Sequence, residues 1–256
     1  MLRRYIKRKI VFGLIGVGAL VAIGAYLFVP SVALAAPPPG VNINLGTNYT
    51  VPVQLILSII AISMLPMIMI MMTSFTRIVI VLSILRQGLG TMSTPPNIII
   101  TGVAIILSMF IMNTTLTNIY NNAYVPLTQH KITDQVAIQR GEGDFSQFMI
   151  KETLPDQLIF AESMAHVHPK TPKQLPFSVL LTAFVLSQLK IAFWLGIVVY
   201  IPLIVIDIVV ASGLMSMGMI MVPPTMVSMP LKIIVFIVAG GWDLVVKMLL
   251  QSFGVG

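Results

Sequence analysis

Five charged side chains lie inside or beside strongly apolar stretches of the chain: Arg77, Lys190, Asp207, Asp243 and Lys247. A charge at the centre of a bilayer costs at least about 2.5 to 3.5 kcal/mol, so each of them needs a partner or a path to water. Asp243 and Lys247 are four residues apart in the order that favours pairing along one helix, and we interpret them as a structural ion pair. For the other three, both structural ion pairs and functional charges stay open.

The sequence gives little support for catalysis. The motifs for phosphate binding, for a nucleophilic serine and for a zinc hydrolase are missing. A proton relay would need more than one acid deep in an apolar block, and only Asp207 has such a position. His166 and His168 lack further metal ligands nearby, so we interpret them as part of a solvated loop. We therefore expect no enzyme activity, no bound metal and no cofactor.

Methionine recurs at every second position within residues 213–224, at Met215, Met217, Met219 and Met221. A spacing of two fits neither a packed helix face nor a coiled-coil seam. The two glycines of this segment and the proline pair at its end predict a loop or a broken helix. Because methionine is unbranched, soft and apolar, several such side chains can close around changing shapes. The segment therefore predicts an adaptable apolar seal rather than a reaction centre.

The composition indicates a membrane-associated protein. Hydrophobic residues make up 57% of the chain and charged residues 9%, against about 25% charged residues in a soluble domain. The net charge of +7 arises mainly from five basic residues among the first nine, and the rest of the chain holds ten basic and eight acidic residues. This local excess is no evidence for nucleic-acid binding. The chain has no cysteine, which excludes disulfides and thiolate metal sites.

The N-terminal residues resemble a secretory signal sequence. A basic start is followed by an apolar stretch at 10–29, by Pro30 and by a small-residue cleavage motif that ends at Ala35. We expect cleavage between Ala35 and Ala36. The apolar stretch is longer than in most signal sequences, so an uncleaved membrane anchor stays open as the alternative.

The rest of the chain divides into blocks by composition. We expect a signal peptide at 1–35, an extended tether at 36–52, a first hydrophobic helical block at 53–119, a polar helical insert on the periplasmic side at 120–176, and a second hydrophobic helical block at 177–256 that holds the methionine-rich segment. Hydropathy alone predicts four spanning segments in the mature chain. However, prolines and charges interrupt the apolar runs, which favours helices buried in a protein assembly over helices that face lipid.

Two blocks give more detailed expectations. Between Val53 and Leu85 the pattern allows one long, kinked helix or a re-entrant pair, and 97–119 is a second spanning candidate. The insert predicts amphipathic helices with four apolar side chains buried: Phe145, Phe148, Met149 and Leu158.

Several segments of the chain together carry a resemblance to one family. They are Thr73–Gly90, Pro95–Asn97, Phe193, Ile201–Pro202, Ile206–Asp207, Val209–Ser212, Met217–Pro224, Gly241–Trp242 and Gln251–Phe253. These segments resemble the FliP family of the flagellar type III export gate. The resemblance covers about 53–253, apart from the insert, and the chain is more similar to this flagellar branch than to its injectisome relatives, the SctR family.

The resemblance implies an all-α protein whose helical hairpins assemble into a pseudo-hexameric gate in the flagellar basal body at the bacterial inner membrane. Five copies would join FliQ and one FliR, with FlhA and FlhB as further components of the export apparatus and FliO as an assembly factor. The resemblance also implies that the methionine-rich segment lines the pore as a gate, which assigns this role to Met217, Met219 and Met221, with Met215 beside them.

The chain departs from the family pattern at a few positions. Gln188 stands where the family has a glutamate, which removes an expected charge partner of Lys190. Gly240 replaces an aspartate, and the insert segment 148–160 lacks the usual arginine and acidic pattern. These differences concern ion pairing rather than the family.

We therefore expect a non-enzymatic subunit of the gate through which unfolded flagellar proteins cross the inner membrane. The alternative in another class is an ion or solute transporter with Arg77, Lys190 and Asp207 around one site in the helical bundle. A third reading, an intramembrane enzyme, has only isolated charges to support it.

Overall fold

A computed structural model describes residues 42–44, 50–52, 59–60, 63–64, 67–91, 93–167, 169, 171–219 and 221–255 of the chain. The expected signal peptide, its cleavage site at Ala35 and Ala36, and most of the expected tether lie outside these residues. Within the tether, β1 (Asn42–Asn44) pairs antiparallel with β2 (Thr50–Pro52), with Ile43 opposite Val51.

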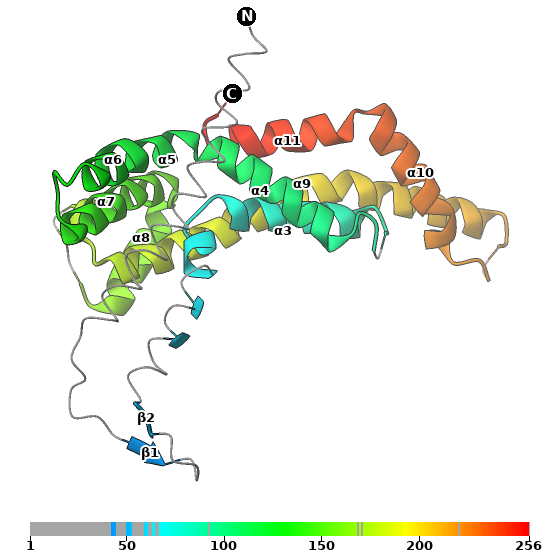
Figure 1. The fold of residues 1–256 in the computed structure, drawn as a ribbon. Helices are drawn as coiled ribbons and strands as arrows, with labels where there is room; N and C mark the ends of the chain where they lie inside the picture. Colours follow the sequence, from blue (N-terminus) through cyan, green and yellow to red (C-terminus); the bar gives the residue numbers. More distant parts are fainter. Residues whose placement is uncertain are drawn as a thin grey trace, which may run out of the picture. The chain divides into compact units, whose positions relative to one another are not determined.

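The all-α prediction is confirmed, since helices form nearly all of the described structure apart from this short ribbon (Figure 1). The longer helices are α3 (Phe75–Gly88), α4 (Asn97–Ile111), α7 (Asp134–Glu152), α8 (Pro155–Ala165), α9 (Phe177–Ser216), α10 (Pro224–Val238) and α11 (Gly241–Gln251). The short ones are α5 (Asn113–Ile119), a π-helical turn (Tyr120–Tyr124), α6 (Val125–Thr128) and a 3₁₀ turn (Pro172–Gln174).

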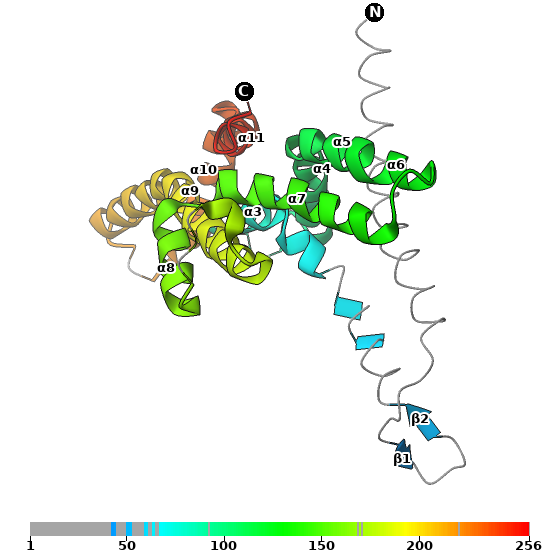
Figure 2. The ribbon, with the colours of Figure 1, turned by 90° about the vertical axis from the view of Figure 1, so that its left-hand side faces the viewer.

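The described residues form two compact units. Those up to residue 72 and at 113–148 belong to one, and those at 73–112 and 149–255 belong to the other. In the first unit, α5, the π-helical turn and α6 follow one another directly, and Figure 1 and Figure 2 both show α5 and α6 alongside α7. Arg140 of α7 donates to the backbone oxygen of Asn122 inside the π-helical turn at 3.1 Å. The wider turn disrupts the regular backbone bonding, and the arginine supplies a donor there.

In the second unit, α3 packs along α9, and α4, α8 and α10 pack against these two helices (Figure 1). Ile78, Val81, Leu82 and Leu85 of α3 face α9 and α4 with at most 3% of their surface exposed. The close approach depends on Gly196 of α9, where any Cβ would collide with the side chain of Ile84. The apolar periodicity of α3 and this glycine together bring the two helices into contact.

The expectation of one long helix or a re-entrant pair between Val53 and Leu85 is only partly covered by the described residues. A helical turn at 67–71 ends at Met72, and α3 begins at Phe75 after a turn. Of the four side chains expected to be buried in the insert, Phe145 and Met149 are buried, while Phe148 and Leu158 are half-buried.

Membrane-spanning length is clearest in α9. This 40-residue helix contains an 18-residue window with a mean hydropathy of 2.6, of which only 11% is buried within the chain. By length and composition, the described residues contain this one span, or up to three if α4 with α5 and α6, and α10 with α11, each count as a broken span. Half of the first of the four predicted spans, Val53–Met72, lies outside the described residues. The apolar surface of α9 needs lipid or neighbouring chains to cover it.

Candidate functional site

The methionine-rich segment forms the end of α9 and its connection to α10. The helix continues through Gly213 to Ser216, so the loop is shorter than the sequence predicted. Gly218 then adopts a positive φ of 73° and donates to the Met215 oxygen, while the Met219 N–H donates to the Leu214 oxygen. These two bonds form the Schellman motif, which needs a left-handed residue and therefore stops the helix at glycine.

All four methionines are exposed on the single chain. Their exposed fractions are 64% for Met215, 76% for Met217, 45% for Met219 and 95% for Met221. Met215 lies in the last turn of α9, and the other three lie in the connection. The arrangement offers flexible apolar surface at the tip of the α9–α10 hairpin, which suits contact with other chains rather than a packed core.

A buried lysine ties this hairpin to α3. Lys232 of α10 donates to Asp207 of α9 at 2.6 Å and to the backbone oxygen of Gly88, the last residue of α3, at 2.8 Å. Its side chain is 6% exposed, and that of Asp207 is 35% exposed. A cation at a helix C-terminus is favourable because the last carbonyls lack intrahelical donors. Asp207 Oδ1 has no hydrogen-bond partner among the described residues.

The sequence analysis identified Asp207 as an isolated acid and did not single out Lys232. The only sign of the pair was a lysine within the apolar run Met229–Val238. Because the two residues are 25 positions apart on different helices, only the hairpin brings them together.

Arg77 is fully buried in α3 and donates to three other segments. Its Nε donates to Gln188 Oε1 at 2.8 Å, its Nη1 to the Ser252 backbone oxygen at 2.8 Å and to Ser252 Oγ at 3.1 Å, and its Nη2 to Glu152 at 3.3 Å. The guanidinium also lies 3.6 Å from the centre of the Phe253 ring. This use of all three nitrogens exploits the planar fork of arginine.

Burial is the largest influence on the pKa values of Arg77 and Glu152. It lowers the pKa of Arg77 to about 10, although the charge of Glu152 opposes this shift. It raises the pKa of the Glu152 carboxyl above its ordinary value, although Arg77 opposes that shift. Removing two charges from water therefore costs more than their attraction returns, which is common for buried ion pairs.

Gln188 and Lys190 have different partners from those expected. The sequence analysis treated position 188 as a missing charge partner of Lys190, but Gln188 is fully buried and binds Arg77. Its Nε2 also donates to the backbone oxygen of Glu152 at 3.1 Å. Lys190 instead pairs with Asp156 of α8 at 3.6 Å, and both side chains are mostly exposed. Two residues apart on a helix, positions 188 and 190 do not share a face.

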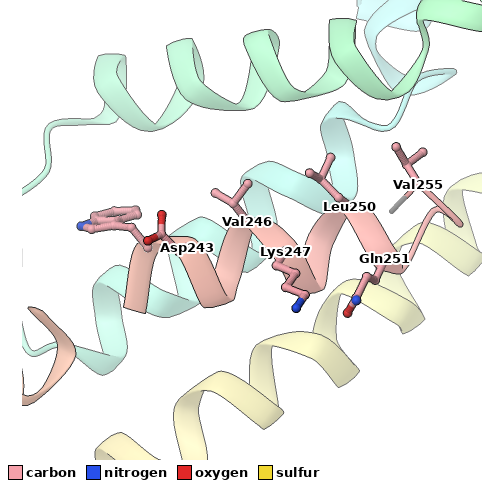
Figure 3. A pocket seen from close by; sticks show the side chains of 7 residues that line it. Asp243, Val246, Lys247, Leu250, Gln251 and Val255 are labelled. Carbon is pink, nitrogen blue, oxygen red and sulfur yellow. The ribbon is translucent and has the colours of Figure 1, made fainter. Parts of the chain in front are cut away.

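The ion pair expected between Asp243 and Lys247 is not present. Asp243 lies in the first turn of α11, where the helix N-terminus favours a negative charge. Figure 3 shows its carboxylate and the Lys247 ammonium pointing in different directions, and both side chains are exposed. Together with Trp242 they line a shallow groove of about 330 Å³ on α11. The ring of Trp242 meets the ring of Phe236 edge-on, with 5.5 Å between the ring centres. In water neither charge gains much by pairing.

The remaining candidates do not form a reaction centre. His166 ends α8 as an exposed residue with a positive φ of 52°, and His168 lies outside the described residues. No group of three or more histidine or acidic side chains in the described part of the chain could hold a metal ion. Arg77, Lys190 and Asp207 each bind a different partner, so the structure does not bring them together at one site.

Comparison with known proteins identifies relatives over most of the chain. A model of the FliP family matches residues 57–249. The chain is 42% identical over 237 residues to the flagellar biosynthetic protein FliP of Pectobacterium carotovorum subsp. carotovorum, which covers 91% of each chain. It is 44% identical over 207 residues to that of Bacillus subtilis, covering 80% of this chain and 94% of the relative. The protein of Aquifex aeolicus is 40% identical over 220 residues, covering 85% and 92%.

Proposed function

The chain belongs to the FliP family, and on this premise we propose that it is a core subunit of the flagellar protein export gate. In this role it forms part of the pore through which unfolded flagellar proteins cross the bacterial inner membrane. The protein acts by shape and packing rather than by catalysis, and the energy for export comes from other components.

One observation carries the gate assignment, namely four exposed methionines at alternate positions in and before the α9–α10 connection. In an assembly of several copies, these connections meet around a common axis and exclude water and ions. An entering polypeptide displaces them at low cost, because thioether side chains repack easily around different shapes.

The exposed apolar surface supports assembly with other chains. Large apolar side chains of α4, α9 and α10 are exposed in the single chain, which is unusual for a protein that works alone in water. We assign this surface to contacts with four further copies, FliQ, FliR and lipid in the flagellar basal body. FlhA and FlhB are the proposed neighbours in the export apparatus, and FliO is the proposed assembly factor.

The transporter alternative receives no support from the geometry. It requires Arg77, Lys190 and Asp207 around one site, whereas each of them has a separate partner. Two of these pairs are largely buried and link helices, while the pair of Lys190 is exposed to solvent.

The gate is tested by changing the methionine side chains in cells that carry this chain with its partner proteins. Substituting alanine for all three of Met217, Met219 and Met221 removes most of the apolar side-chain volume of the proposed seal. The membranes are then expected to leak small ions while the complex still assembles. Replacing the same three with leucine keeps the apolar volume and is expected to keep the membrane tight. Ion flux and the yield of the complex are measured in parallel.

Met164 of α8 provides a matched control, since it is 68% exposed and lies outside the connection. Its replacement with alanine is expected to leave both ion flux and assembly unchanged. An assembled alanine variant without an ion leak would contradict the gate assignment.

A further inference from the structure

We propose that Arg77 positions the C-terminal end of the chain, and that its fork of N–H donors, rather than its ion pair with Glu152, keeps α11 docked. This inference concerns how the subunit holds its own shape. Its test reads conformation and does not depend on the proposed function in export.

The first step is the contact between Arg77 and the residues just beyond α11. Two donors of one guanidinium nitrogen reach Ser252, at 2.8 Å to its backbone oxygen and at 3.1 Å to its hydroxyl. The same guanidinium stacks on Phe253, which is 3% exposed. Two consecutive residues at the end of the chain are thus fixed by one side chain of α3.

The second step concerns the hydrogen bonds at the C-terminal end of α11, where Arg77 binds. Gly254 adopts a positive φ of 66° and donates to the Gln251 oxygen, and the Val255 N–H donates to the Leu250 oxygen. The last carbonyls of a helix lack donors within the helix, and a cation there is favourable. Arg77 supplies both the donor and the charge from another helix, so it acts as the cap of α11.

The third step is the fixed orientation of the fork. Gln188 accepts from Arg77 Nε at 2.8 Å and donates to the Glu152 backbone at 3.1 Å, so its amide is held at both ends. The contact of Arg77 with the Glu152 carboxylate is longer, at 3.3 Å. Three of the four hydrogen bonds of the guanidinium therefore go to neutral groups, and the carboxylate accepts the longest one.

The fourth step is that few other buried side chains hold α11 in place. Val245 and Leu249 are the buried apolar residues within this helix, with 4% and 0% exposed, while Trp242 and Leu244 are exposed. At its other end, Gly240 and Gly241 join it to α10 at a bend of 67°. A short helix with a glycine joint at one end depends on the contact at its other end to stay in place.

The test exploits the absence of cysteine from the natural chain. Val245→Cys places one thiol on the buried face of α11, and its rate of reaction with a maleimide in isolated membranes reports undocking of the helix. Ala104→Cys, at a fully buried position of α4, reports general loosening. Both rates are measured in three backgrounds: natural, Arg77→Lys and Glu152→Gln.

The two substitutions separate the fork from the charge. Arg77→Lys keeps the charge beside Glu152 but cannot reach Ser252 and Gln188 together, so the thiol at position 245 is expected to react at least about tenfold faster. Glu152→Gln leaves the buried guanidinium without its anionic partner, which lowers the stability of the fold as a whole, but it keeps the bonds to Gln188 and Ser252, so the rate at position 245 is expected to rise less than in Arg77→Lys. The thiol at position 104 is expected to react slowly throughout.

Three results would overturn the proposal. They are a faster reaction in Glu152→Gln than in Arg77→Lys, no change at position 245 in either, or an equal rise at position 104 in Arg77→Lys. If the Arg77→Lys chain does not accumulate in cells, the double variant Ser252→Ala, Phe253→Leu removes contacts of Arg77 by changing its partners instead. Because the bond of Arg77 to the Ser252 backbone oxygen stays, this variant is expected to give a smaller rise at position 245 than Arg77→Lys, and an unchanged rate there would equally overturn the proposal.

Discussion

The buried contact of Lys232 with Asp207 and Gly88 predicts that its two partners respond unequally to mutation. Asp207→Asn keeps the shape but leaves a buried ammonium with neutral acceptors only. Leaving a buried charge without its partner costs about 3 kcal/mol or more. Lys232→Met removes the charge and keeps the apolar stem, and the Asp207 side chain that it leaves unpaired is 35% exposed, against 6% for Lys232. Its main cost is the lost donor to Gly88, about 1 kcal/mol.

These costs translate into measurable differences in thermal stability. For a chain of this length, 1 kcal/mol corresponds to about 2 to 4 °C in Tm. We expect Asp207→Asn to lower the Tm of the detergent-extracted chain by about 6 to 12 °C, and Lys232→Met by about 2 to 4 °C. The double variant contains no buried charge at this place and should be more stable than Asp207→Asn alone.

The exposed pair of Lys190 and Asp156 serves as the control. Asp156→Asn makes the same chemical change as Asp207→Asn at a side chain that is 79% exposed, and it should leave the Tm almost unchanged. The reasoning would be refuted if Lys232→Met were as damaging as Asp207→Asn, or if the double variant were the least stable of the three.

Two further predictions concern Glu152 and Gly218. Because burial raises the pKa of Glu152, the folded chain holds this proton more tightly than the unfolded chain, so its stability should fall as pH rises from about 4.5 through the folded pKa. Glu152→Gln should lose this dependence, and thermal melts of both proteins across pH 4 to 8 would show it; parallel curves would contradict the assignment. Gly218→Ala places a Cβ at a φ of 73° and should destabilise the end of α9 by about 1 kcal/mol, whereas Gly213→Ala within the helix should stabilise it. Equal effects of the two substitutions on Tm would argue against this helix end.

The sequence predicted the features that depend on composition and on local pattern. Low charge and long apolar runs indicated a membrane-associated chain, the family resemblance implied an all-α fold, and α9 lies within the predicted second block. The spacing of the methionines indicated a connection rather than a packed helix face. The loop was predicted too long because Gly213 costs a helix only about 1 kcal/mol, so the helix passes through it. Sequence alone does not show which of two glycines will adopt a positive φ.

The charged contacts were harder to predict because they join distant segments. Arg77 is 111 residues from Gln188 and 175 from Ser252, and its partners become clear only when α3, α9 and the end of α11 pack together. Lys232 carries no local motif, so it was missed. Asp243 and Lys247 had the right spacing for a pair, yet the helix N-terminus and water compete for their charges.

The most direct test of the gate is cross-linking between copies at the methionine connection. Because the chain has no cysteine, Met221→Cys gives each copy one thiol at a side chain that is 95% exposed. If the connections of several copies meet around a pore, mild oxidation of membranes that contain the assembled complex should produce disulfide-linked dimers. Met164→Cys, at an exposed methionine of α8, should not produce them. An intact complex of several copies in which Met221→Cys forms no cross-link would contradict the account.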